Sequence, residues 1–474
     1  MSTAFSAGFS RIDITPPFGG VPLAGYGATR FRLSGQVMDR LHLNTVAVGT
    51  DGKAEGLLMT ADFLDMKNPL FSELRSAAAE AVGLDPGHVY IGCTHTHSAP
   101  DLLTSDLPSI LTYKKDCLPK WFAESALRAA ADLKPAKIFY GKTEVGHEGA
   151  RFNFNRYYYM VAREKLDSYT EADLHPVGAN FGTVYSSDPE HYAYVRHEEE
   201  ADHEMMIIKF ARENADDIVL LNFAAHASIT GGSKVFKMSS DYPGALRARV
   251  EELCPGTKCT FLQGCAGNTN TDSRIASEGI PGLTYGPGRS HYAYAAVLAA
   301  YAKKLLDKGL TESESSVLAF AKRIHTGKRD HSMDHLVPEA EKVAAVFREE
   351  GHTDRVRQMV REAGFSSPYH CTAAIRKAAQ PETESFEVNA VRFGDVAMTT
   401  GPFELFSGTG KHIKAASPFK MTLVKAYSCD CYSYLPSINS QPNSYEAIQG
   451  AFVRGTAEEL EPVYQEMLEE LYQL

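Results

Sequence analysis

Apolar residues along the chain follow two spacings. Short apolar runs bounded by Gly, Asp or Asn predict β-strands, and longer segments with apolar residues every three or four positions predict amphipathic helices. Strands are predicted at residues 43–50, 55–64, 88–95, 137–146, 201–211, 217–227, 258–268 and, as a pair, 385–401. Helices are predicted at residues 68–84, 118–133, 241–254, 289–309 and 456–474. This alternation predicts an α/β fold with a β-sheet core flanked by helices.

One segment departs from the alternation. The sequence "SMDHLVPEAEKVAAVFREEGHTDRVRQMVREAGF", residues 332–365, is strongly charged and has helical spacing throughout. The chain contains no internal repeat, no low-complexity tract and no Gly/Ser-rich linker. We therefore expect a single domain over residues 1–474, with a helical insertion near residues 328–380.

Composition and charge exclude several classes of function. The 474 residues are 44% hydrophobic and 23% charged, which is ordinary for a globular protein. A formal net charge of -11 argues against a nucleic-acid partner, which would require a basic surface. No apolar run reaches the roughly 18 residues of a transmembrane helix. The N-terminus has neither the basic nor the apolar region of a signal peptide, so we expect a cytoplasmic protein, or an exported one if such a peptide has been removed.

Eight cysteines are too few for a disulfide scaffold of this length. Cys429 and Cys431, in "SCDCYSY", have the spacing of half a soft-metal site. No second pair of this kind lies nearby in the sequence, so buried free thiols are the more economical interpretation.

Polar side chains stand where several predicted strands end. The stretch "VYIGCTHTHSAPD" delivers His95 and His97 to the end of an apolar run, and "LLNFAAHA" delivers His226 in the same way. The stretch "TFLQGCAGNTNTD" runs from a strand into amide residues, and "VAMTTGPFELF" places Glu404 after a strand and a Gly-Pro turn. Ligand sites in open α/β sheets gather at the carboxyl ends of strands. Histidines and a carboxylate at such ends suit a divalent metal, with zinc favoured by nitrogen ligands.

Each of these residues also has a plain structural interpretation. A single histidine at a strand end is most often a hydrogen-bonded surface or core residue. The His95–His97 pair is a stronger signal, because alternation along a continuing strand would point both rings to the same face. Glu404 alone would signify little, since a carboxylate near a strand end is usually solvated.

Aromatic and guanidinium side chains are frequent in segments that the pattern places in loops or at loop edges. These are Tyr157, Tyr158, Tyr159, Tyr285, Tyr292, Arg156 and Arg289. Such groups suit a polar or aromatic small molecule better than long alkyl chains. Ordinary surface tyrosines are the alternative interpretation.

Several short motifs occur in a fixed order along the chain. The opening "SRIDITPPFGGVPLAGYG" is followed by "THTHSAP", "NRY", "NFAAH", "DYPG", "FLQGCAGN", "PFELF" and "YLP". In these motifs and their order the chain resembles the neutral/alkaline ceramidases and their bacterial relatives. The resemblance runs from about Gly8 to Tyr445. It implies a mixed α/β catalytic domain with one catalytic Zn²⁺ ion.

The resemblance also implies roles for individual residues. The implied zinc ligands are His95, His226, Glu404 and Tyr434. His97 corresponds to the family histidine that lies beside the metal and faces the bond being broken. Arg156, in "FNFNRYY", corresponds to a position near the pocket. Asn268 and Asn270 could orient the substrate or the attacking water, or could equally serve the turn backbone.

The sequence departs from the family pattern at four places. Asn270 occupies the position of the active-site serine to which a nucleophilic role has been assigned, and an amide cannot act as that nucleophile. The family's Gly-Glu-Pro reads "TGPFE" here, and Ser433 replaces the glycine before Tyr434. The chain ends soon after that motif, without the immunoglobulin-like domain of the true ceramidases. We therefore expect a smaller, soluble substrate rather than a lipid at a membrane surface.

Three functions are compatible with these residues. The first is a zinc-dependent hydrolase that cleaves a carboxamide (N-acyl) bond through a metal-bound hydroxide, whose formation requires zinc to lower the pKa of water from about 15.7 towards 7. In this mechanism His97 shuttles a proton, and Tyr434 leaves the metal to hydrogen-bond the oxyanion. The second is an esterase or lactonase using the same site. The third is a catalytically silent metal-binding protein. The expected partner is a small N-acyl or lactone substrate, with a homo-oligomer possible and no nucleic acid.

Overall fold

The computed structural model describes residues 4–25, 32–147, 150–177, 190–231, 235–271, 290–365, 367–441 and 444–474. Within these residues a nine-stranded mixed sheet has the order β18-β16-β15-β8-β1-β5-β6-β7, with β20 paired to β8. Its strands are β1 (Phe5–Asp13), β5 (His42–Thr50), β6 (Lys53–Ala61), β7 (Val89–Cys93), β8 (Lys134–Glu144), β15 (Glu204–Arg212), β16 (Asp217–Phe223), β18 (Thr257–Gln263) and β20 (Thr311–Glu312). Most neighbours are antiparallel, but β6–β7 and β16–β18 are parallel. The predicted α/β fold with a mixed sheet is confirmed.

A second, four-stranded sheet packs on the first. It has the order β21-β22-β23-β25 and consists of β21 (Leu318–Lys328), β22 (Thr383–Phe393), β23 (Val396–Thr400) and β25 (Met421–Lys425). Alternation along β22 explains the packing, because Val391 and Phe393 join the core of the large sheet while Val388 and Ala390 face a separate cluster with the C-terminal helix. The small sheet is therefore buried on both faces.

Helices cover the outer faces of the two sheets. Helix α3 (Leu118–Ala131) packs on β1 and β5, and α1 (Leu70–Val82) packs against α3 and β7. Helices α4 (Asp241–Leu253) and α6 (His291–Lys308) share a core with β15, β16 and β18. Helices α10 (Ser407–Ala416) and α12 (Thr456–Tyr472) lie on the small sheet. Helix α1 lies within the predicted range 68–84 and ends at Gly83, whose φ of 68° forms a left-handed cap that non-glycine residues adopt at a penalty.

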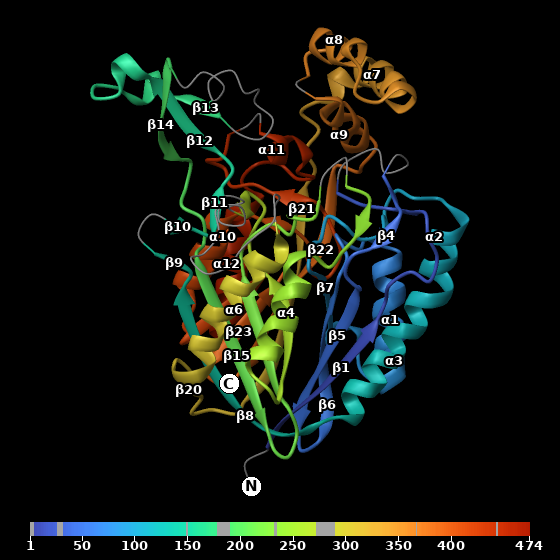
Figure 1. Cartoon of the computed structure of the whole chain (residues 1–474), viewed down its shortest axis with the longest axis vertical. Helices are drawn as coiled ribbons and strands as arrows, with labels where there is room; N and C mark the ends of the chain where they lie inside the picture. The colour runs from blue at the N-terminus through green and yellow to red at the C-terminus, as the bar shows by residue number, and fades with distance from the viewer. Residues whose placement is uncertain are drawn as a thin grey trace.

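The predicted helical insertion is confirmed between β21 and β22. It comprises α7 (Val337–Glu350), α8 (Asp354–Glu362) and α9 (Pro368–Ala378), which share a small hydrophobic core of their own. Figure 1 shows these helices together at the end of the molecule opposite the N-terminus. Short elements elsewhere are β2 (Val21–Pro22), β3 (Leu33–Ser34), β4 (Gln36–Val37), α2 (Pro108–Thr112), β9 (Gly146–His147), β10 (Ala150–Arg151), β11 (Asn153–Asn155), β12 (Tyr158–Ala162), β13 (His175–Val177), β14 (Tyr192–His197), β17 (Lys237–Met238), β19 (Thr269–Thr271), β24 (Glu404–Leu405), β26 (Tyr434–Leu435) and α11 (Tyr445–Gln449).

The carboxyl ends of four strands, β7, β16, β18 and β25, meet across the two sheets. The segment after β25 runs beside the end of β7, since Cys93 N donates to the Tyr427 carbonyl at 3.1 Å. It also reaches the end of β18, since Ala426 N donates to the Gln263 carbonyl at 3.0 Å. Gly264 N in turn donates to the carbonyl of Phe223, the last residue of β16. Strand ends that are far apart in the sequence are therefore joined directly by backbone hydrogen bonds.

A buried ion pair between Asp62 and Arg247 stabilises the region where these strand ends meet. Asp62, which follows β6, accepts two hydrogen bonds from the guanidinium of Arg247 on α4, at 2.9 and 2.6 Å. Both side chains are almost inaccessible to solvent. Asp62 also accepts from the Thr94 hydroxyl, next to the two histidines of the "THTH" turn. The carboxylate thus ties α4 and this turn to the end of β6.

We predict that Asp62→Ala destabilises the protein strongly, because Arg247 would remain buried with its charge uncompensated. The expected loss is about 3–5 kcal/mol in the free energy of unfolding, measured by urea denaturation. The control is Asp13→Ala, which breaks an exposed pair with Arg40 and should cost about 1 kcal/mol or less. Equal losses in the two variants would contradict the bracing role of Asp62.

Candidate metal centre

Strand β7 ends before the two histidines of the "THTH" turn. Cys93 is its last residue, and His95 has a φ of 62°, in the left-handed region that is uncommon for residues other than glycine. The argument from strand alternation therefore does not apply to His95 and His97. Their ring centroids nevertheless lie 5.0 Å apart, because the chain turns sharply at His95 and brings both rings to one side.

His95 and His226 face each other across the junction of strand ends. Nε2 of His95 lies 3.2 Å from Nε2 of His226, and both side chains are buried. Two nitrogen ligands bound at about 2.0–2.1 Å in a tetrahedral site are separated by about 3.3 Å. The two histidines therefore stand at the separation that one shared metal ion requires.

Backbone carbonyls orient both rings. Nδ1 of His95 lies 2.9 Å from the Leu64 carbonyl, and Nδ1 of His226 lies 3.1 Å from the Ala266 carbonyl. A carbonyl can only accept, so each contact requires a proton on Nδ1 and leaves the lone pair of a neutral ring on Nε2. This is the arrangement in which protein histidines bind metals through Nε2.

Glu404 completes a cluster of electron-rich atoms. It begins the short strand β24, where it is paired in parallel with Tyr434 of β26. Its Oε2 lies 3.2 Å from Nε2 of His95, and it receives no hydrogen bond from any residue that the structure describes. A buried carboxylate needs a compensating positive charge. The buried guanidinium of Arg156 interacts with Glu404, and a cation bound between Glu404 and the histidines would compensate the charge directly.

Tyr434 lies beside this carboxylate in the interior. Burial, together with the charge of Glu404, raises the pKa of Tyr434 well above its ordinary value. Its ring lies 5.9 Å from that of Tyr445. The preceding residue, Ser433, has a φ of 65°, which a glycine would adopt more easily, and its carbonyl accepts from Glu404 N.

His97 stands next to the pair formed by His95 and His226. The ligand nitrogens of the three histidines all lie within 4.8 Å of one another, and among the described residues they are the one group of three or more His, Cys, Asp or Glu side chains arranged in this way. Nδ1 of His97 lies 3.2 Å from the Gly25 carbonyl, which again directs the Nε2 lone pair inwards. Burial lowers the pKa of His97 well below its ordinary value, so that the neutral ring is favoured. A side chain on Gly25 would collide with this ring, since its Cβ would lie 2.3 Å from Nδ1.

Arg156 lies behind His226. Its guanidinium donates to Oε1 of the buried Glu446 at 2.6 Å, and its Nη2 lies 2.7 Å from Nδ1 of His226. That nitrogen can accept from Arg156 or donate to Ala266, but not both. Only the second state leaves Nε2 of the neutral ring as a metal ligand.

The two asparagines have different environments. The Asn268 side chain is engaged at both its nitrogen and its oxygen, since it donates to Glu199 at 2.6 Å and accepts from the backbone of Ser407 at 3.0 Å. Asn270 lies on β19, in register with Phe154, and is half-buried. Its amide makes no side-chain hydrogen bond to a described residue. Asn270 is therefore the amide that remains available to a ligand.

Tyr427 is a residue near the centre that the sequence did not point to. It has a φ of 54°, and its ring lies 3.9 Å from that of His95. Its hydroxyl is buried and has no hydrogen-bond partner among the described residues. It follows the strand β25, so the rule that found Glu404, a polar residue after a strand end, could also have found Tyr427.

The remaining sequence candidates do not belong to the histidine cluster, and two of them lie outside the described residues. Cys429 and Cys431 are free thiols, as are the other six cysteines. Tyr157 is buried and Tyr292 is exposed. Tyr285 and Arg289 lie outside the residues that the structure describes.

Comparison with solved structures identifies the fold. The neutral ceramidase of Pseudomonas aeruginosa is 15% identical and superposes with a TM-score of 0.68, over 100% of this chain and 75% of that chain. A ceramidase complexed with C2 is also 15% identical, with a TM-score of 0.66, over 100% of this chain and 76% of that chain. No family model matches the sequence, and a search of curated proteins finds no match. The predicted ceramidase-like fold is confirmed.

We predict that His226→Ala removes most of the metal that the purified protein binds, because the 3.2 Å pair of nitrogens is lost. The measurement is metal content per chain by mass spectrometry after dialysis against zinc. His412→Ala, which removes an exposed histidine on α10, is the control and should retain the wild-type content. Stoichiometric metal in His226→Ala would show that this residue is not a ligand.

Proposed function

We propose that the protein is a zinc-dependent hydrolase that cleaves a carboxamide (N-acyl) bond. The proposed ligands are His95, His226, Glu404 and Tyr434. The observation that carries the proposal is the approach of His95 Nε2 to both His226 Nε2 and Glu404 Oε2, each at 3.2 Å. The ceramidase-like fold around this cluster supports an amide as the substrate.

The donor set fits zinc on chemical grounds. Two imidazole nitrogens, a carboxylate and a phenol suit a borderline cation better than Mg²⁺ or Ca²⁺, which prefer oxygen ligands alone. When bound, zinc would lower the pKa of a water molecule and polarise the substrate carbonyl.

His97 is proposed to move the proton. Its Nδ1 proton is held by the Gly25 carbonyl, so Nε2 of the neutral ring can accept a proton from the attacking water. The same nitrogen can then pass that proton to the departing amine, which leaves poorly unless it is protonated. Proton transfer of this kind contributes about 10²–10⁴-fold to the rate.

The other polar residues are proposed to orient the substrate. Asn270 has an amide available for a hydrogen bond, whereas Asn268 holds the loop that bears it. Arg156 is anchored by Glu446 and holds its positive charge behind His226. Tyr434, kept neutral by burial, can donate its phenol hydrogen to the oxygen of the carbonyl under attack.

The first test is hydrolysis itself. We expect the purified protein to hydrolyse N-acyl amides, to lose this activity after treatment with a chelator, and to regain it on addition of zinc. The panel includes lactones and aryl esters. Turnover of esters or lactones without amides would support the esterase or lactonase instead. Bound zinc without any turnover would support a metal-binding protein without catalysis, and turnover that survives metal removal would contradict the proposed mechanism.

The attack is expected to be direct, because Asn270 cannot serve as a covalent nucleophile. Intact-mass measurements during turnover should therefore show no acyl adduct, and hydrolysis in ¹⁸O water should label the acid product. A trapped acyl-protein would require a different nucleophile.

We predict that His97→Gln keeps its metal but loses amide hydrolysis by about 10²-fold or more in kcat. An activated ester should be affected less, because its leaving group needs no proton. Parallel assays on an anilide and a matched nitrophenyl ester, with metal content measured on the same samples, provide the comparison. Equal losses on both substrates would indicate that His97 only positions its neighbours, and loss of metal would make it a ligand.

A further inference from the structure

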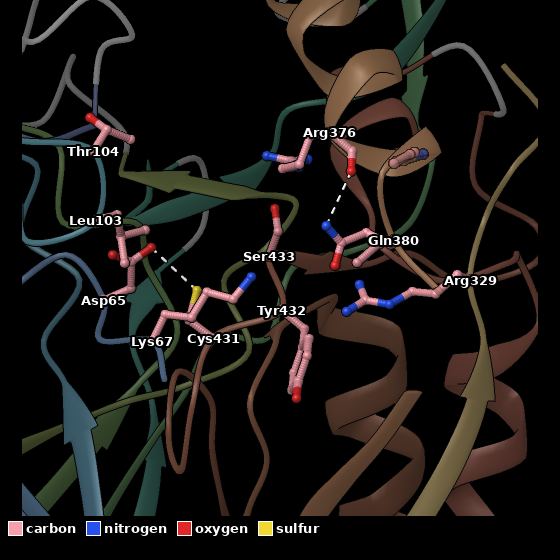
Figure 2. A pocket seen from close by; sticks show the side chains of 12 residues that line it. Asp65, Lys67, Leu103, Thr104, Arg329, Arg376, Gln380, Cys431, Tyr432 and Ser433 are labelled. Carbon is pink, nitrogen blue, oxygen red and sulfur yellow. Dashed lines mark hydrogen bonds between the residues drawn. The ribbon is translucent and has the colours of Figure 1, made fainter. Parts of the chain in front are cut away.

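A cavity beside the metal-ligand cluster has no role in the proposed hydrolysis. This cavity of about 280 Å³ opens between the helical insertion and the loop that precedes Tyr434 (Figure 2). Helix α9 and the residues after it supply one wall, and residues 431–433 supply the wall opposite. Figure 2 shows the side chains of Arg376 and Ser433 on either side of this space.

The walls of the cavity continue from the segments that hold the proposed metal ligands. Asp65 follows Leu64, whose carbonyl orients His95, and its carboxylate accepts a hydrogen bond from the Cys431 thiol at 3.3 Å. Leu103 and Thr104 follow the "THTHSAPD" turn. Residues 431–433 lead directly into Tyr434. A molecule in the cavity would therefore adjoin the metal-ligand cluster.

The cavity is lined by four cationic side chains, and two of them are already neutralised. Arg329 pairs with Glu384, and Nζ of Lys377 pairs with Asp330 at 2.5 Å. The tyrosine ring at position 432 lies beside two of the cations, with the Arg329 guanidinium 5.2 Å and the Lys67 ammonium 6.0 Å from its centroid. Both cations are therefore placed to interact with the face of this ring.

Lys67 and Arg376 are the two cations without an acidic partner. Neither forms an ion pair with any residue that the structure describes. Arg376 donates to the carbonyl and side-chain oxygens of Gln449 at 2.9 and 3.1 Å, both through Nη2, so its other nitrogens remain available. Arg376 lines the cavity and is exposed to solvent. The one carboxylate of the lining, Asp65, is already bonded to Cys431 and interacts with His95.

We propose that this cavity binds a small oxyanion of the substrate, a carboxylate or a phosphate, through Arg376 and Lys67. The proposal rests on the proposed hydrolase, since it assigns the substrate class of the same site. A guanidinium and an ammonium with unused donors form charge-assisted hydrogen bonds with such a group. The hydroxyl of Ser433 and the amide of Gln380 add neutral donors on the same walls. The substrate is therefore an acidic N-acyl compound rather than a neutral lipid amide.

The test is direct binding, which does not require turnover. Three probes share an octanoyl chain: N-octanoylglycine, its uncharged primary amide N-octanoylglycinamide, and N-octanoyl-O-phosphoethanolamine. Calorimetry uses the zinc-loaded His97→Gln protein, so that hydrolysis does not consume the probe. We expect at least one charged probe to bind about 10-fold or more tightly than the uncharged amide. The tighter of the two charged probes distinguishes carboxylate from phosphate.

Two further substitutions, each made in the His97→Gln protein, test whether the preference for the charged probe depends on the cavity. Arg376→Gln and Lys67→Gln should each reduce the preference for the charged probe to about threefold or less. Because Lys67 is exposed, Lys67→Gln should fold normally and tests the proposal even if Arg376→Gln misfolds. Arg361→Gln, on α8 of the same insertion and outside the cavity, removes the same charge and should leave the preference unchanged.

Equal affinity for charged and uncharged probes, no binding of any probe at millimolar concentration, or a preference that survives both substitutions would overturn the proposal. Failure of the hydrolase proposal would give a different result from failure of the oxyanion-site proposal. In that case the wild-type protein would cleave no amide, while the preference for the charged probe in binding would persist.

Discussion

In the interior of the protein His95 Nε2 lies 3.2 Å from both His226 Nε2 and Glu404 Oε2, and these two contacts are the constraint on which the surrounding structure depends. Such an arrangement is stable only if positive charge lies among the three atoms. The neighbouring groups are consistent with this requirement. Backbone carbonyls orient the lone pairs inwards, and the ring of Tyr427 packs against that of His95.

The backbone around these atoms is held in conformations that it would not adopt by itself. His95, Tyr427 and Ser433 all have φ between 54° and 65°, and each lies on a segment that contributes to the centre. Left-handed residues other than glycine carry an energetic penalty, which the surrounding packing must offset. The hydrogen bonds between the ends of β7, β18 and the segment after β25 provide that support. Close backbone approach matters as well, because a Cβ at Gly267 would lie 2.4 Å from the Glu404 carbonyl.

The proposed metal ligands and the proposed substrate-binding cavity come from different parts of the structure. The proposed metal ligands come from strand ends and from short strands between them, which are rigid and deeply buried. The cationic cavity lies at the outer side of the same segments and gains one wall from α9 of the helical insertion. An insertion can change which substrate is held without disturbing the metal-ligand cluster, because it contributes no residue to that cluster. Likeness to ceramidases in fold is therefore compatible with a substrate of different charge.

The sequence by itself determined the class of fold, the helical insertion and most of the helices and strands, because burial imposes periods of two and about 3.6 residues on the chain. It also indicated His95, His97, His226 and Glu404, since each polar residue follows an apolar run and belongs to a motif with a recognisable order. Pattern could not reveal that β7 stops at Cys93, because the turn at His95 depends on a bond to the Leu64 carbonyl and on contact with Tyr427. Nor could it reveal that the amide of Asn268 bonds within the protein while Arg376 and Lys67 have no acidic partner among the residues that the structure describes. Which polar groups neutralise one another is decided by side chains from distant parts of the chain, and only the tertiary structure brings those side chains together.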